Sequence, residues 1–97
     1  MEPFLISKVE ETFTVSGRGS CVAPGVPKEG LPHGIRVGDQ VELRRPDGSK
    51  FQTKIGGIEY ATLIKGGSQW PIRFPADVKA EDVPVGTEIW WIGPYAK

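Results

Sequence analysis

Few side chains in this sequence are able to do acid–base or nucleophilic chemistry. The 97 residues include one histidine, His33, and one cysteine, Cys21. Hydrolysis by a Ser-His-Asp site needs a histidine as base, and His33 lies between a proline and a glycine, a context typical of an exposed loop. Glu10 and Glu11 are adjacent, and adjacent strand residues point to opposite faces, so these carboxylates do not share one substrate atom. The sequence therefore predicts no catalytic residues and no enzyme activity.

Metal and nucleotide sites are also not predicted. One cysteine and one histidine are too few for a Cys/His zinc cluster or an internal disulfide, so we expect no metal and no cofactor. Gly17-Arg18-Gly19 resembles a phosphate loop, but no helix and no Gly-Lys-Ser/Thr follow it. We expect a bend at Gly17, with Arg18 free to pair with a carboxylate such as Glu59, and no nucleotide-phosphate site.

Charged residues are balanced overall but not locally. Twelve Lys and Arg offset twelve Asp and Glu, so any nucleic-acid binding needs a local site. Between positions 44 and 54 the local balance is +3, and between positions 77 and 88 it is −3. The basic segment predicts contacts with RNA phosphates, and the alternative is an ordinary solvated turn. The candidate phosphate contacts are Arg44, Arg45, Lys50 and Lys54.

Tryptophan is the other unusual feature. Trp90 and Trp91 are consecutive, so on a strand one faces inward and the other outward. An outward tryptophan is a frequent protein-interface anchor. The alternative is that the proline-rich segment 24–32 covers it.

Glycine and proline indicate which elements position these residues. With 13 glycines and 9 prolines the chain does not suit a helical bundle. Short apolar blocks with β-branched neighbours predict strands, and Pro46 to Ser49 predicts the turn of a hairpin. We expect a loop without a strand from Pro24 to Gly34, a bulge at Gly56-Gly57, an edge or bulge at Pro71, and one helical turn within 76–83. The expected strands cover 4–9, 12–16, 20–23, 40–45, 50–61, 69–74 and 87–92.

This pattern predicts an all-β single domain over residues 1–97, built as a small closed barrel or a sandwich of antiparallel strands. The first residues lack a basic region, and no apolar run approaches the length of a membrane span. We therefore expect neither a signal peptide nor a membrane partner, and a cytoplasmic location.

Four segments are similar to one protein family. Thr12-Phe13-Thr14-Val15-Ser16-Gly17-Arg18-Gly19-Ser20-Cys21-Val22, after the acidic Glu10-Glu11, resembles the start of the second domain of elongation factor Tu and related translational GTPases. Arg36-Val37-Gly38-Asp39-Gln40-Val41-Glu42-Leu43 looks like the family's Lys-Val-Gly-Asp/Glu turn and strand. Ile55-Gly56-Gly57-Ile58-Glu59 and the stretch from Val78 to Ile89 are similar to later blocks of that domain.

The resemblance implies a closed six-stranded antiparallel Greek-key barrel with at most one short helical turn. In the family this barrel helps to hold the aminoacylated end of transfer RNA and meets ribosomal RNA, so the resemblance implies a stand-alone, non-catalytic module that binds transfer or ribosomal RNA. The ligand-binding residues that it implies are Glu10, Glu11, Phe13, Val15, Gly17 and Glu59.

The chain also departs from the family. It has no GTPase domain, Thr62 stands where the family has arginine, and the family's Gly-Asp-Asn-Val-Gly turn is replaced by Gly67-Ser68-Gln69-Trp70-Pro71. Two alternatives therefore remain open. One is a protein-interaction module that docks a translation-associated protein through an exposed tryptophan and the proline-rich loop. The other is an excised domain of a larger translation factor.

Overall fold

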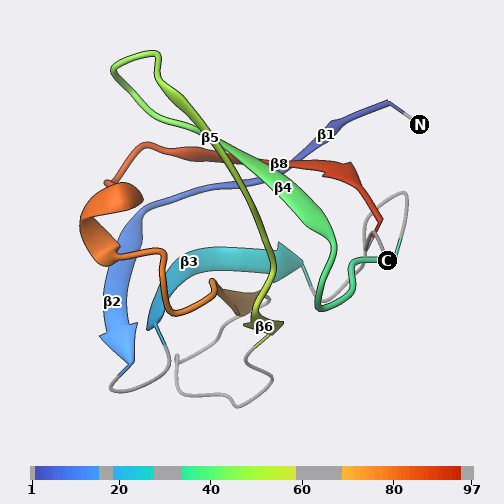
Figure 1. Ribbon diagram of the computed structural model, residues 1–97, viewed down its shortest axis with the longest axis horizontal. Coiled ribbons are helices and arrows are strands. Elements are labelled where there is room, and N and C mark those ends of the chain that lie inside the picture. The colour runs from blue at the N-terminus through green and yellow to red at the C-terminus, as the bar shows by residue number, and fades with distance from the viewer. Residues whose placement is uncertain (1, 16–18, 28–33, 59–68, 95–97) are drawn as a thin grey trace.

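Eight strands and one short 3-10 helix form the part of the chain that the computed structural model describes, residues 2–15, 19–27, 34–58 and 69–94 (Figure 1). β4 and β8 alternate buried and partly exposed side chains, which is the period expected when one face of a sheet is buried. The elements are β1 Phe4–Lys8, β2 Glu11–Val15, β3 Gly19–Pro27, β4 Gln40–Arg44, β5 Lys50–Lys54, β6 Gly57–Ile58, β7 Gln69–Arg73, η1 Ala80–Asp82 and β8 Glu88–Gly93. The predictions of an all-β fold and of one helical turn within 76–83 are confirmed for these residues.

The strands form two four-stranded antiparallel sheets. Sheet A has the order β1-β8-β4-β5, and sheet B has the order β2-β3-β7-β6. Among the described residues the strand assignment gives eight strands in two sheets, not the six strands in one ring that the family resemblance implies. The chain is divided between the sheets at two places. One lies between β1 and β2, which correspond to the separately expected strands 4–9 and 12–16, and the other lies within the expected strand 50–61, which gives β5 and β6.

Adjacent residues at each division bond to different sheets. Val9 N–H donates to Thr87 C=O at 2.8 Å, next to β8, and Glu10 N–H donates to Ala23 C=O of β3 at 2.9 Å. At the other division, Ile55 N–H donates to Asp39 C=O at 2.9 Å, and Gly56 N–H donates to Arg73 C=O of β7 at 2.7 Å. The predicted bulge at Gly56-Gly57 is therefore a passage between sheets.

The hairpin of β4 and β5 forms where the turn chemistry predicts it. Gly48 has φ +92°, a conformation that favours glycine, and its N–H donates to Arg45 C=O at 2.9 Å. Asp47 Oδ1 accepts the Ser49 N–H at 2.9 Å and the Ser49 hydroxyl at 2.6 Å. These two bonds lower the pKa of the Asp47 carboxyl.

The prediction of no strand between Pro24 and Gly34 is wrong for its first four residues. β3 runs on to Pro27, and Val26 and Pro27 pair with Trp70 and Gln69 of β7 after an irregular stretch. A Cβ on Gly25 would lie 1.9 Å from the Trp70 carbonyl oxygen, so the two backbones approach closely at this bulge. The sequence predicts an edge or a bulge at Pro71, and Pro71 lies opposite this bulge.

One apolar cluster joins the inner faces of both sheets. Phe74, Val78 and Val83, from the connection between β7 and β8, have no exposed surface. The strands contribute Ile6, Val22, Val26, Val41, Leu43, Ile58, Ile72, Ile89 and Trp91. Phe4 stacks on Trp91 with ring centroids 5.1 Å apart. None of the described helical segments has the length and hydropathy needed to cross a bilayer.

Candidate functional site

The outer face of sheet A carries a row of charged residues. The strand register aligns Lys8 of β1 with Glu88 of β8, Glu88 with Arg44 of β4, and Arg44 with Lys50 of β5. Neighbouring strands lie about 4.8 Å apart, so this row crosses the whole sheet in roughly 15 Å. Three cations and one carboxylate thus share one row, although Lys8 and Glu88 are far from the basic hairpin in sequence.

Arg44 is held in a fixed position within this row. Its Nε donates to Glu42 Oε1 at 2.8 Å, and its guanidinium carbon lies 4.2 Å from the ring centroid of Trp90. Gln52 Nε2 donates to the second oxygen of Glu42 at 3.3 Å. The bond from Arg44, followed by that from Gln52, lowers the pKa of the Glu42 carboxyl. The Arg44 side chain keeps 36% of its surface exposed, so it is ordered and still accessible to a ligand.

Arg45 is fixed by the segment that follows β7. Its Nε donates to Asp82 C=O at 2.7 Å, and its Nη1 donates to the Ser49 hydroxyl at 3.3 Å. The guanidinium also lies 5.3 Å from the ring centroid of Phe51. The acidic segment 77–88 therefore lies beside the basic hairpin, so the two local charge excesses are neighbours in space.

Lys8, Arg44 and Arg45 surround a pocket of about 350 Å³, which we call the basic pocket. Pro46, Gly86 and Glu88 complete its lining. The Glu88 carboxylate accepts the indole N–H of Trp90 at 2.9 Å. The Lys8 side chain makes no hydrogen bond or ion pair with another described residue. The pocket therefore presents three cationic side chains against one carboxylate, which suits an anionic ligand.

The two consecutive tryptophans divide as predicted. Trp91 is 2% exposed, and its indole N–H donates to the buried Asp39 Oδ2 at 3.1 Å. Trp90 is half-buried on the outer face, under the Arg44 guanidinium. Among the described residues, a guanidinium and not a proline ring is stacked on its indole.

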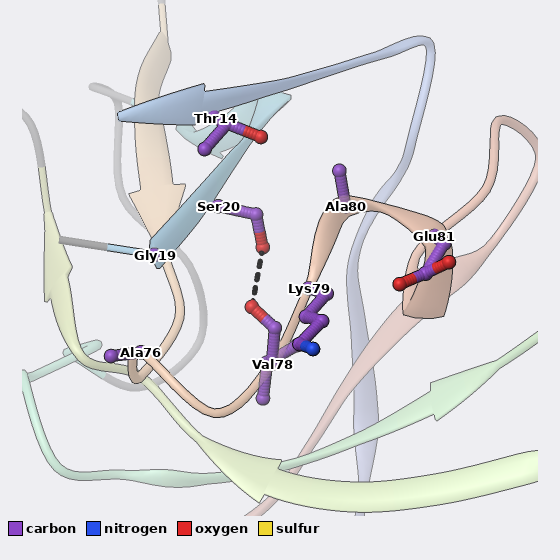
Figure 2. Close-up of a pocket in the computed structure, with 8 residues that line it drawn as sticks. All are labelled: Thr14, Gly19, Ser20, Ala76, Val78, Lys79, Ala80 and Glu81. Carbon is purple, nitrogen blue, oxygen red and sulfur yellow. Dashed lines mark hydrogen bonds between the residues drawn. The ribbon is translucent and has the colours of Figure 1, made fainter. Parts of the chain in front are cut away.

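A second depression, of about 600 Å³, lies between the end of β2, the start of β3 and the segment 76–81 (Figure 2). Its walls are mostly small or apolar, and Lys79 and Glu81 give it one charge of each sign. The Ser20 hydroxyl, the dashed contact in Figure 2, already donates to Val78 C=O at 3.1 Å. The lining residues are Thr14, Gly19, Ser20, Ala76, Val78, Lys79, Ala80 and Glu81. This set offers no acid–base pair and no excess of charge.

The residues implied by the family resemblance are only partly described. Glu10 and Glu11 are exposed, and Phe13 keeps 36% of its surface. Phe13 is paired with Cys21, whereas its neighbour Thr12 is paired with Val22 of the core, so Phe13 belongs to the outer face of sheet B. The Val15 side chain, Gly17, Arg18 and Glu59 lie outside the described residues.

Phe13 belongs to a row across sheet B. The register aligns it with Cys21 of β3, and Cys21 with Arg73 of β7. Cys21 is a free thiol with no exposed surface. The Arg73 guanidinium lies over Gly57, where a Cβ would come within 2.4 Å of it. The structure therefore brings Glu11 and Phe13 onto one strand of sheet B, on a different sheet from the basic pocket.

Sequence reasoning missed Lys8 and Glu88 as members of the basic surface. Lys8 carries no local signal, because it is a single cation at a strand end, and Glu88 counts in the sequence only toward the acidic segment 77–88. Only the pairing of β1 with β8 and of β8 with β4 brings them to Arg44. His33, the one histidine, lies outside the described residues.

Within the described ranges, no three His, Cys, Asp or Glu side chains gather in a way that would hold a metal ion. Comparison of the chain with protein-family models, curated proteins and solved structures finds no match.

Proposed function

We propose that this protein is a non-catalytic module that binds the phosphate backbone of RNA, transfer or ribosomal, through the outer face of sheet A. The observation that carries the proposal is the row of Lys8, Arg44 and Lys50 across the sheet, with Arg45 beside it at the basic pocket. Lys54 lies outside this row, at the other end of β5, where it is paired with Gln40 of β4. Lysine and arginine contacts to phosphate fix position without reading sequence, so we expect weak sequence preference.

The fixed positions of the two guanidinium groups support this proposal. Arg44 and Arg45 are each held by an acceptor at Nε, and both line the basic pocket that a phosphate can enter. Preorganised donors lose less side-chain entropy on binding than free ones. The resemblance to the translational GTPase barrel points to RNA independently, although it points to the Phe13 face of sheet B. Docking of a protein through a bare tryptophan has less support, because Trp90 lies under Arg44.

We also infer that the two sheets close into one six-stranded barrel. β1 with β2, and β5 with β6, would each be one bent strand that forms an edge of both sheets. The hydrogen bonds of Val9 with Glu10, and of Ile55 with Gly56, support this because each pair bonds to both sheets in succession. Slow amide exchange at all four residues is expected, and fast exchange at either pair would contradict closure.

Binding of bulk transfer RNA at low salt tests the proposed function. We expect Arg44→Ala combined with Lys50→Ala to weaken binding, because two members of the row are lost. Arg44→Ala alone is also compared with Lys79→Ala, since Lys79 lines the other depression and its replacement removes the same single charge. Equal losses in both variants would indicate a general charge effect and contradict the assigned surface. No binding by the wild-type protein would contradict the function itself.

A further inference from the structure

Arg44 combines a guanidinium held over an aromatic ring with a partly exposed side chain. Trp90 lies on one side of the guanidinium, with 4.2 Å between its ring centroid and the Arg44 guanidinium carbon. Glu42 accepts the Nε–H in the guanidinium plane at 2.8 Å, which fixes the rotation of that plane. The side chain nevertheless remains 36% exposed. The guanidinium is thus ordered from one side and from its edge.

Such a surface has a defined chemistry. Unpaired nucleobases stack on aromatic rings and on arginine guanidinium planes, whereas paired bases inside a duplex present only their edges and backbone. Arg44 also lies between Glu88 and Lys50 in the cationic row. A nucleotide whose base stacks on Arg44 therefore has Lys8, Arg45 and Lys50 nearby for its phosphates.

We infer that the ligand of this surface is a single strand, and that one unpaired base stacks on the Arg44 guanidinium while Trp90 supports it from below. This inference rests on the proposed function. Trp90 acts here as a positioning residue, and its N–H also donates to the Glu88 carboxylate at 2.9 Å. Leu5, 42% exposed and paired with Trp90, extends the apolar edge of the platform.

The test compares two short strands of equal charge, an unstructured RNA and the same length of abasic strand, by fluorescence anisotropy at one salt concentration. We expect the wild-type protein to bind the strand with bases about tenfold more tightly, the effect of roughly one stacked base. Arg44→Lys keeps the charge and loses the plane, so this variant is expected to bind both strands equally. Its affinity for the abasic strand is expected to fall less than its affinity for the strand with bases, because lysine still contacts a phosphate as a point charge.

Variants of Trp90 test whether its ring supports the Arg44 guanidinium or only stabilises the fold. Trp90→Phe retains a ring under the guanidinium and is expected to keep most of the preference for bases, whereas Trp90→Leu is expected to lose it. Combining Trp90→Leu with Arg44→Lys is expected to cause no further loss of the preference for bases, because both changes remove the same stacking surface. Circular dichroism checks that each variant is folded.

The outcomes distinguish the inference from the function on which it rests. Equal binding of the two strands by the wild-type protein, with normal salt dependence, would overturn base stacking and leave backbone binding intact. An unchanged preference for bases in Arg44→Lys would overturn the role of the guanidinium. Absence of binding to either strand would overturn the proposed function as well.

Discussion

Replacement of Asp39 by alanine is expected to destabilise the fold strongly, because Asp39 connects the turn before β4 to the core. Asp39 is 4% exposed as a residue, and its Oδ2 accepts the Trp91 indole N–H at 3.1 Å and the Arg36 backbone N–H at 3.0 Å. Trp91 itself is 2% exposed, so the substitution removes the acceptor of a buried N–H.

The size of the effect follows from these contacts. A buried donor left without an acceptor costs about 1 to 3 kcal/mol, and the loss of a bond to a charged acceptor adds a similar amount. Relief from burying the carboxylate offsets part of this, leaving a net loss of about 3 kcal/mol. For a domain of this length such a loss lowers the melting midpoint by about 15 °C.

Thermal and urea unfolding of four proteins measure this coupling: wild type, Asp39→Ala, Trp91→Phe and the double variant. Phenylalanine has no indole N–H, so the double variant has no buried donor that lacks its acceptor. Its loss of unfolding free energy is therefore expected to be smaller than the sum of the two single losses by about 1 to 2 kcal/mol. Asp39→Asn keeps a neutral acceptor and is expected to lose about half as much as Asp39→Ala. Strict additivity, or a loss below about 0.5 kcal/mol in Asp39→Ala, would refute the reasoning.

Three further predictions concern backbone space and titration. Gly25→Ala is expected to prevent the β3–β7 pairing, seen as lost amide protection around Val26, because the new Cβ would lie 1.9 Å from a backbone oxygen; a stable variant with native protection would contradict this. Gly48→Ala is expected to cost about 1 kcal/mol in urea unfolding, because φ is +92° in open space, while Gly34→Ala, in open space without such a φ, is expected to be neutral or stabilising. The Glu42 pKa is lower in the folded protein than in the unfolded chain, so the contribution of Glu42 to stability is present above the unfolded pKa and is lost as pH falls through the folded pKa. The difference in unfolding free energy between wild type and Glu42→Gln is therefore expected to shrink in acid. A difference that does not change with pH would contradict the Arg44–Glu42 pairing.

Local chemistry made part of the fold predictable. The Pro46 to Ser49 turn depends on residues within four positions of one another, and the strand alternation of β4 and β8 is written in consecutive residues. Glycine and proline misled the prediction at Pro24 to Pro27, since they normally interrupt strands. There Gly25 is needed within β3 because the β7 backbone lies against it, and that neighbour is distant in sequence.

The candidate site was predictable to a similar extent. Arg44, Arg45 and Lys50 are close in sequence, so their charge excess was visible. Lys8 joins them only through the pairing of β1 with β8, and Trp90 reaches Arg44 only through the pairing of β8 with β4. The division of the long segment 50–61 between two sheets depends likewise on which strands Ile55 and Gly56 meet.

The salt dependence of RNA binding tests the central claim most directly. If Lys8, Arg44, Arg45, Lys50 and Lys54 each meet a phosphate of a single strand, the slope of log affinity against log salt is about −3.5. Affinity then falls about 100-fold between roughly 50 and 200 mM salt. Replacing Lys8, Arg44 and Lys50 together by Gln is expected to reduce the magnitude of the slope by about 2. A wild-type slope near zero, or the same slope in this variant, would contradict binding of phosphates by the cationic row of sheet A.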